Sequence, residues 1–348
     1  MEAVTNTTKN NLHIKKSEVV LGFFYILYKM KHILISGLLL LTFSFSCEKK
    51  SPNEAEPIIK DEFVILDYSV SELELSNKFE LNPSKGGTLQ NHLLEEASGI
   101  CVSRSNPAIL WSHNDSGHPN RIFPIGTNGE NYGHYVLTGA GTRDYEDICI
   151  GPGEKSGVNY IYLGDIGDNH AQYSYIVIYQ FEEPNTVGLD SAQVYYINAE
   201  DITRYEFTYP DGPRDAETLM IDPWTKDLYI ISKRDYRSIV YRAKYPFDKT
   251  KRTELEKLAQ LPFNWAVAGD ISADGTKIVI KDKNRLYFWE RNINESVVDA
   301  LKRKPKLLPY VLEPQGESFG WSESGDEYFT LSEQSGIYPP DVYAYKRK

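Results

Sequence analysis

A short unit of sequence recurs five times along the chain and constrains its fold more than any other feature. Each copy has a short apolar run, and a second apolar run that ends in polar residues follows it. The first runs are ASGICV (97–102), YEDICI (145–150), AETLMI (216–221), AGDISA (268–273) and GESFGW (316–321). Aligned copies lie 48, 71, 52 and 48 residues apart, and a repeat of about 50 residues is typical of propeller blades.

The repeat predicts an all-β fold, a β-propeller of four-stranded blades that fills residues 63–348 as one domain. Five units are visible, and the diverged segments leave room for a sixth blade. The last unit has only three strand-like runs, so we expect an N-terminal strand from residues 63–76 to complete the final blade and close the ring. The long interval between Glu146 and Glu217 should hold the outer strands of the second blade and an insertion. Residues 296–304 should form a short helix on a connection.

The segment from Asp144 to Asn169 indicates where a functional site should lie. It contains two apolar runs joined by GPGEKSG, with acidic residues at both outer ends. In an antiparallel hairpin the start of the first strand lies beside the end of the second. Carboxylates are therefore gathered at one end of a small sheet, where they repel one another unless a cation or hydrogen bonds offset the repulsion.

Extended around the ring, this arrangement predicts an acidic mouth at one face of the propeller. The starts of the inner strands should contribute Glu96, Asp144, Glu146, Asp147, Asp215, Glu217, Asp270 and Glu317. The ends of the second strands should add His113, Asn114, Asp115, Asp165, Asp168, Asn169, Lys233, Arg234, Lys281 and Glu333. For any single acid, the alternative is a structural role in which it accepts hydrogen bonds from backbone N–H groups.

The types of residue at the mouth suit calcium, which prefers carboxylate, amide and carbonyl oxygens. The expected metal ligands are Glu96, Asp144, Glu146, Asp147, Asp165, Asp168, Asn169, Asp215 and Asp270. The expected binding residues are Asn114, Asp115, Arg234, Lys281, Glu317 and Glu333, and the expected catalytic residues are His113, Glu217 and Lys233. Lysine and arginine among these acids would suit an anionic group of a substrate.

Other motifs carry less weight. GESFG (316–320) matches G-x-S-x-G by letter, but that motif acts on a strand-to-helix elbow, whereas here a strand repeat continues. Ser318 is therefore a weak candidate for a nucleophile. Cys101 and Cys149 fall in the same column of adjacent units, which favours buried free thiols over a disulfide.

Residues 30–46 are typical of a secretory signal, with Lys31 before an apolar run and Cys47 after a small residue. They resemble the signals of bacterial outer-membrane lipoproteins, so Cys47 is the expected lipidation site. Residues 47–62 would then be a polar tether, and residues 1–29 an extension upstream of the true start at Met30. The alternative is a two-part membrane anchor that includes the upstream apolar run, residues 19–28.

The charge balance excludes nucleic acid as a partner. Residues 1–46 contain five Lys and two Glu, so the remainder has 33 basic and 47 acidic residues and a net charge of −14. We expect a monomer in the cell envelope, in the outer membrane and either periplasmic or surface-exposed. Its lipid would be its only contact with the membrane.

HNDSG (113–117), GDIGDN (164–169), YPDGPRDAETL (209–219) and ISADG (271–275) together resemble the secreted β-propellers of the phytase-like and strictosidine-synthase/lactonase-like superfamily. The resemblance covers residues 90–348 and concerns architecture more than activity. It implies a central channel with an acidic mouth that often holds calcium. Two functions follow: a calcium-dependent hydrolase of phosphoesters or lactones, and a non-catalytic propeller that binds a glycan, a peptide or a partner protein.

Overall fold

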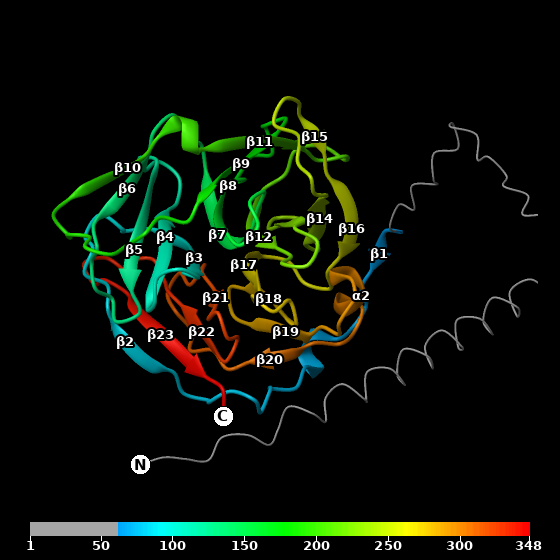
Figure 1. Ribbon diagram of the computed structural model, residues 1–348. Coiled ribbons are helices and arrows are strands. Elements are labelled where there is room, and N and C mark those ends of the chain that lie inside the picture. The colour runs from blue at the N-terminus through cyan, green and yellow to red at the C-terminus, as the bar shows by residue number, and fades with distance from the viewer. Residues whose placement is uncertain (1–61) are drawn as a thin grey trace, which may run out of the picture. The chain divides into compact units, whose positions relative to one another are not determined.

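The computed structural model describes residues 62–348, and these form five small sheets arranged in a ring (Figure 1). The fold is a five-bladed β-propeller, so the all-β prediction is confirmed and there is no sixth blade within the described residues. The innermost strands are β3 (Ala97–Val102), β7 (Tyr145–Pro152), β12 (Ala216–Ile221), β17 (Ala266–Ile271) and β21 (Gly320–Trp321). These are the five apolar runs of the sequence repeat, and they surround the centre of the ring.

The remaining strands of each blade follow outward from its innermost strand. Blade one continues with β4 (Ile109–Asn114), β5 (Arg121–Gly126) and β6 (His134–Leu137), and blade two with β8 (Asn159–Asp165), β9 (Ile176–Glu182) and β11 (Thr203–Thr208). Blade three has β13 (Leu228–Ser232), β14 (Ile239–Ala243) and β16 (Glu256–Gln260), and blade four has β18 (Lys277–Asp282), β19 (Leu286–Glu290) and β20 (Lys306–Leu308). Blade five has β22 (Glu327–Thr330), β23 (Asp341–Lys346) and β2 (Ser84–Thr88).

Each pair of neighbouring blades encloses its own apolar core, five in all among the described residues. The inner strands are buried on both faces, which is why they read as continuous apolar runs rather than as alternating patterns. Short turns join the strands of a blade. In the turn between β17 and β18, for example, Gly275 adopts a φ of 73°, which glycine tolerates without steric cost.

The outer edges of the first three blades are covered by strands from elsewhere in the chain. β10 (Val194–Ile197) lies between β9 and β11, within the interval where an insertion was predicted, and pairs in parallel with β6 of blade one. β15 (Thr253–Glu254) pairs in parallel with β11, and β1 (Val64–Ile65) pairs in parallel with β16. Exposed strand edges are templates for aggregation, and these additions cover them.

An N-terminal strand closes the ring, as predicted, but it is not the strand that the sequence suggested. β2 pairs antiparallel with β23 of blade five, whereas residues 63–76 lie against blades three and four. The chain from β1 to β2 runs along the outside of the ring as a belt (Figure 1). Leu75 bridges Leu307 of blade four, and Phe79 bridges Arg347 after the last strand of blade five.

Helical structure is confined to short connections. α2 (Val297–Leu301) lies within the predicted segment 296–304, and its N-cap Ser296 accepts a hydrogen bond from the Asp299 backbone. Two 3₁₀ turns, η1 (Val70–Glu72) and η2 (Ala199–Asp201), complete the list for residues 62–348. None of the helices in this range has the length and apolar character needed to cross a bilayer. Cys47 and the expected signal and tether, residues 30–61, lie outside the described residues.

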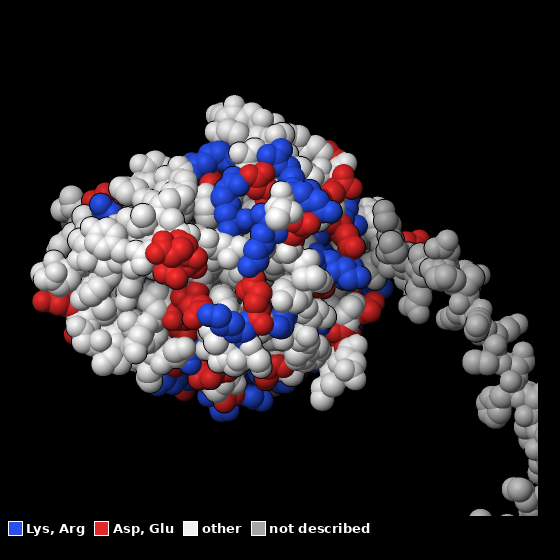
Figure 2. Space-filling model, turned by 45° about the horizontal axis from the view of Figure 1, so that its top comes forward, with Lys and Arg blue, Asp and Glu red and all other residues white. Residues whose placement is uncertain are grey.

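Charged side chains are unevenly distributed over the surface. In Figure 2, lysine, arginine and acidic residues crowd together on one side of the visible face, and the other side is largely uncharged. A buried ion pair joins blades three and four. Arg291, after β19, donates from both terminal nitrogens to Asp222, after β12, at 2.8 Å each.

Candidate functional site: an acidic mouth

A β-bulge at the start of four of the inner strands shapes the site. The register between the first two strands of a blade shifts at Ala97/Ile100, Tyr145/Asp147, Ala216/Thr218 and Ala266/Ala268. A bulge leaves one residue unpaired and re-aims its side chain. In blades two and three that extra residue is an acid, Glu146 and Glu217. In blade four it is Val267, so the acidic ring is interrupted there.

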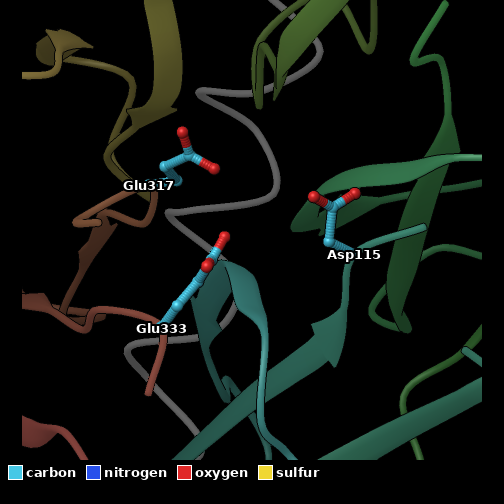
Figure 3. Close-up of side chains that lie close together, drawn as sticks. All are labelled: Asp115, Glu317 and Glu333. Atoms are coloured by element: carbon cyan, nitrogen blue, oxygen red, sulfur yellow. The ribbon is translucent and has the colours of Figure 1, made fainter. Parts of the chain in front are cut away.

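Seven carboxylates meet at this end of the inner strands. Their oxygens form three overlapping trios, in each of which the three potential ligand atoms lie within 4.8 Å of one another. The trios are Asp115, Glu317 and Glu333; Asp115, Asp144 and Glu146; and Glu146, Asp215 and Glu217. Figure 3 shows the first trio, with Glu317 and Glu333 from blade five facing Asp115 from blade one. The predicted mouth is thus formed from the starts of inner strands and the ends of second strands.

A glycine makes room for two of these carboxylates. Gly167, in the loop after β8, lies so close to them that a Cβ there would collide with the Glu146 carboxylate and lie 2.5 Å from Oδ2 of Asp144. The Gly167 N–H donates to the Asp144 backbone carbonyl at 3.2 Å, which fixes the loop over the site. The GDIGDN motif therefore acts at the mouth through its second glycine.

Three oxygens of the mouth are buried without a hydrogen-bond donor. They are Oδ1 of Asp144, Oε2 of Glu146 and Oε2 of Glu217. Glu146 is only 2% exposed and Glu217 only 3%. A buried carboxylate oxygen without a partner is costly, because desolvation of the charge is not offset. Asp144 and Glu146 share one trio, and Glu146 and Glu217 share another, so cations bound within these trios would offset the cost.

The electrostatic cost is visible in the pKa values of the mouth acids. Burial and the nearby Asp115 and Asp215 raise the pKa of Asp144 to about 6. Burial, together with Asp115 and Asp144, raises the pKa of Glu146 well above its usual range. Burial and the Glu317 charge raise the pKa of Glu333 to about 7. These shifts arise from desolvation and like charges, and a bound cation would oppose both.

Two basic residues offset part of the negative charge. Lys233, after β13, is 4% exposed, and its Nζ donates to Glu217 and lies 3.5 Å from Oε1 of Glu317. Arg234 pairs through Nε with Oδ2 of Asp215 at 2.7 Å and donates to Asn169. The positive charge is concentrated on the side of blades three and five, so Asp144 and Glu146 are left with less compensation.

Asp147 and Asp270, both expected as metal ligands, lie deeper in the ring and bond to backbone amides. Oδ2 of Asp147 accepts from the Leu219 N–H at 2.8 Å, and Oδ1 accepts from the Ile148 N–H at 2.9 Å. Oδ2 of Asp270 accepts from the Trp321 N–H at 2.9 Å. Each acid joins its own inner strand to that of the next blade. Neither belongs to the three trios.

Four other predicted residues hold loops around the mouth. The side chain of Asn114 bonds to the Glu96 N–H and the Leu93 carbonyl. Asp165 accepts from the Asp144 N–H at 2.9 Å, and Asp168 accepts from the amides of residues 172 and 173. Glu96 is half-exposed and pairs with His118 at 3.0 Å. Their contacts organise the loops that present the seven carboxylates.

Two predicted residues with basic side chains are enclosed behind the mouth. His113 is fully buried against Tyr145, and burial lowers its pKa to about 4, so the ring is neutral. It is in none of the three trios of carboxylates. Lys281 is also fully buried, and its Nζ donates to the Gly316 carbonyl. Ser318 is buried as well, with its Oγ bonded to the Leu331 backbone at 2.6 and 3.1 Å, which explains why G-x-S-x-G here has a structural role.

Cys101 and Cys149 are buried free thiols, as predicted. Trp265, Lys283 and Gly167 lie at or beside the mouth and were missed from the sequence. The signal available for Trp265 is its position directly before an inner strand, where blades one to three have Glu96, Asp144 and Asp215.

Comparisons with known proteins find distant likenesses among solved structures. No protein-family profile and no curated protein sequence matches the chain. Among solved structures, the chain is similar to one in a nidogen/laminin complex, with 12% identity, a TM-score of 0.42, and 69% of this chain and 73% of the other covered. It is also similar to a gluconolactonase from Xanthomonas campestris, with 9% identity, a TM-score of 0.41, and 78% and 95% covered. At these identities the likeness concerns the fold alone.

Proposed function

We propose that the mouth binds a divalent cation, calcium, and that the protein hydrolyses a phosphoester or lactone bond in a small anionic substrate. The observation that carries the cation site is the set of buried, unpartnered oxygens of Asp144, Glu146 and Glu217. All donors in the three trios are carboxylate oxygens, and the only histidine predicted there, His113, is enclosed elsewhere. Oxygen donors without nitrogen favour calcium over zinc.

Different residues of the mouth would bind the cation, bind the substrate and transfer a proton. Asp115, Asp144, Glu146 and Asp215 would hold the cation, which supplies a lowered pKa for a bound water and charge stabilisation for a substrate oxygen. Lys233, held between Glu217 and Glu317, lies where it would receive an anionic oxygen. Glu333, with a pKa raised to about 7, would exchange a proton near neutral pH, as a general base or acid requires.

The cation site is tested by thermal unfolding of calcium-free protein with added calcium. Calcium should raise the melting temperature in a concentration-dependent way, because it binds the folded state alone. Asp144→Asn with Glu146→Gln should abolish the rise while preserving the fold, since the like charges are relieved. Glu217 is left unchanged because it pairs with the buried Lys233. The matched control replaces two acids of the outer surface, Glu182→Gln with Glu290→Gln, and should keep the full response. An equal response in both double variants would refute the site.

The second candidate is a non-catalytic propeller that binds a glycan, peptide or protein through the same mouth. It is favoured by the enclosure of His113 and by the structural role of Ser318, which leave carboxylates as the acid–base groups of the mouth. Assays with 4-nitrophenyl phosphate, bis(4-nitrophenyl) phosphate and a γ-lactone separate the candidates. Calcium-dependent turnover that Glu333→Gln reduces at least tenfold would support hydrolysis. Calcium binding without turnover of any of the three would favour the binding module.

We also propose that Cys47 carries a lipid and that the propeller is tethered to the cell envelope by residues 47–62. The proposal depends on the signal-like run before Cys47. Metabolic labelling with a radioactive fatty acid should mark the wild type and spare Cys47→Ala. Equal labelling of both would refute the lipid site, and the location in the outer membrane would then lack support.

A further inference from the structure

A cavity beside the mouth is distinct from the carboxylate trios. It has a volume of about 350 Å³ and is lined by residues 263–265, before β17, and residues 282–285, between β18 and β19. Both segments lie at the same end of blade four as the mouth, because the start of an inner strand faces the end of the second strand. The bulge of blade four supplies Val267 instead of an acid, so this side of the mouth has no carboxylate from an inner strand.

Trp265 is the central residue of this cavity. Its backbone adopts a φ of 59°, an unusual conformation for a bulky residue, and its N–H donates to the Lys233 carbonyl at 2.9 Å. The residue is 37% exposed. Strained conformations that the surroundings hold in place are concentrated at functional sites. Here the strain presents an indole ring at the edge of the mouth.

Three cationic groups surround the Trp265 ring. Nζ of Lys283 lies 4.8 Å from the ring centroid, the guanidinium carbon of Arg234 5.1 Å and Nζ of Lys233 5.4 Å. Lys233 and Arg234 already bind mouth acids at short range. Lys283 is different, because its side chain is 48% exposed and its nearest acid, Glu317, is 4.0 Å away. Lys283 thus retains donors for a ligand.

The polar groups that line the cavity leave mainly donors available to a ligand. Asp282 is the only acid of the lining, and its oxygens accept from the amides of residues 284 and 285 and from the Tyr287 hydroxyl, each at 2.7 Å. Its charge is therefore used within the turn. Arg285 lies 3.9 Å from Oδ2 of Asp282 and is partly engaged by it. Lys283 and the side-chain amides of Asn264 and Asn284 remain, beside Trp265 and Phe263, and Phe263 stacks on Tyr287. The cavity is positive where the mouth is negative.

We propose that this cavity is a subsite for the anionic group of a sugar acid or sugar phosphate whose reactive bond lies over the mouth. Lys283 and Arg285 suit a carboxylate or phosphate. The Asn264 and Asn284 amides offer both donors and acceptors for hydroxyl groups. Trp265 offers a flat apolar surface for the ring of the ligand. The subsite would define the substrate class of the proposed hydrolase, so this inference rests on the proposed function. Binding of a ligand to the subsite can nevertheless be measured without turnover.

The test is a titration of the purified protein, followed by tryptophan fluorescence and calorimetry, with four probes: glucuronate, glucose 6-phosphate, glucose and inorganic phosphate. One or both anionic sugars should bind at least tenfold more tightly than glucose and phosphate. Comparison of glucuronate with glucose 6-phosphate shows whether the subsite prefers a carboxylate or a phosphate. Trp265→Phe and Lys283→Gln should each weaken that binding at least tenfold. Lys283 lies on a half-exposed turn, so its variant tests the subsite even if the Trp265 variant fails to fold.

Trp224 offers a matched control. It is also 37% exposed and lies under a cation, Arg291, at 4.0 Å, but it follows β12 at the end of the strand away from the mouth. Trp224→Phe should leave binding unchanged. Equal affinity for glucose and the anionic sugars, or unchanged binding in the two cavity variants, would overturn the subsite. The calcium-induced rise in melting temperature separates the two proposals. If calcium does not raise the melting temperature but an anionic sugar binds, the cation site alone is refuted. If calcium raises the melting temperature but no anionic sugar binds, the subsite alone is refuted.

Discussion

The carboxylate of Asp147 on β7 accepts a hydrogen bond from the backbone N–H of Leu219 on β12, across the boundary between blades two and three, at 2.8 Å. Asp147 is fully buried, and burial raises its pKa well above the usual range even though backbone amides oppose the shift. The same relationship recurs between Asp270 and the Trp321 N–H of the next blade pair. Both acids join blades, whereas Glu146, next to Asp147 in the sequence, belongs to the carboxylate trios.

Asp147→Asn should therefore destabilise the fold without altering the mouth. The amide keeps one acceptor and turns an N–H₂ group toward a backbone N–H, so we expect a loss of about 2–4 kcal/mol in the free energy of unfolding. Urea unfolding would measure it. Calcium should still raise the melting temperature of the variant. A stable variant that no longer responds to calcium would assign Asp147 to the cation site instead.

The contrast between Glu146 and Asp147 marks the limit of what the sequence could predict. The apolar runs, their spacing and the turns predicted the propeller, since buried strands need continuous apolar sequence and blades need a regular repeat. The bulge at Tyr145/Asp147 could not be predicted, because it depends on pairing with β8. It decides which of two adjacent acids faces the mouth. The sequence predicted both acids as metal ligands, whereas the structure places Glu146 in the carboxylate trios and Asp147 in hydrogen bonds to backbone amides.

Gly167→Ala should disrupt the mouth from the loop that covers it. A Cβ at this position would collide with Glu146 and crowd Asp144, so the two carboxylates would have to move apart. We expect the calcium-induced rise in melting temperature to fall by at least half. Gly141→Ala is a suitable control, since its Cβ would meet only the Tyr179 hydroxyl, at 3.3 Å. An unchanged calcium response in Gly167→Ala would place the cation away from Glu146 and Asp144.

The belt was the second feature that sequence reasoning placed incorrectly. Residues 63–76 look like a strand, yet only Val64 and Ile65 pair as one, with blade three. The closing strand is instead SKGGT (84–88), which has little β propensity. Its glycines are required by packing, because a Cβ on Gly86 or Gly87 would collide with the backbone carbonyl of Thr127 or Asn128 in blade one. β2 was not predicted as a strand because its close packing against the backbone of blade one requires glycines and produces no apolar pattern in the sequence.

Gly87→Ala should accordingly weaken the closure of the ring. Backbone oxygens cannot move aside as a flexible side chain can, so we expect a loss of about 1–3 kcal/mol in the free energy of unfolding. Limited proteolysis should also cut the belt sooner than in the wild type, because β2 would detach from β23 more often. Ser84→Ala, at the exposed start of the same strand, removes one hydroxyl bond to the Ala344 carbonyl and should have a smaller effect, about 0.5–1 kcal/mol. Wild-type stability and proteolysis in Gly87→Ala would show that β2 does not seal the ring.

The last prediction concerns Lys281, whose charge is buried behind the mouth. Burial lowers its pKa from 10.5 to about 8, although Glu313 and Glu317 oppose the shift. Between pH 8 and 10.5 the unfolded chain therefore binds more protons at this residue than the folded chain, and the stability that this group contributes rises with pH over that interval. Below pH 8 both states are protonated, and the contribution is constant and unfavourable.

Lys281→Met removes the titration and keeps an unbranched side chain in the same buried space. The free energy of unfolding of the wild type, minus that of the variant, should increase from pH 8 to pH 9.5 by roughly 1–2 kcal/mol, at about 1.4 kcal/mol per pKa unit. Measurements should stop at pH 9.5, because buried tyrosines with raised pKa values, such as Tyr345 at about 12, act in the opposite direction above their usual value. A difference that stays flat from pH 8 to 9.5 would mean that Lys281 is solvated and titrates as it does in the unfolded chain.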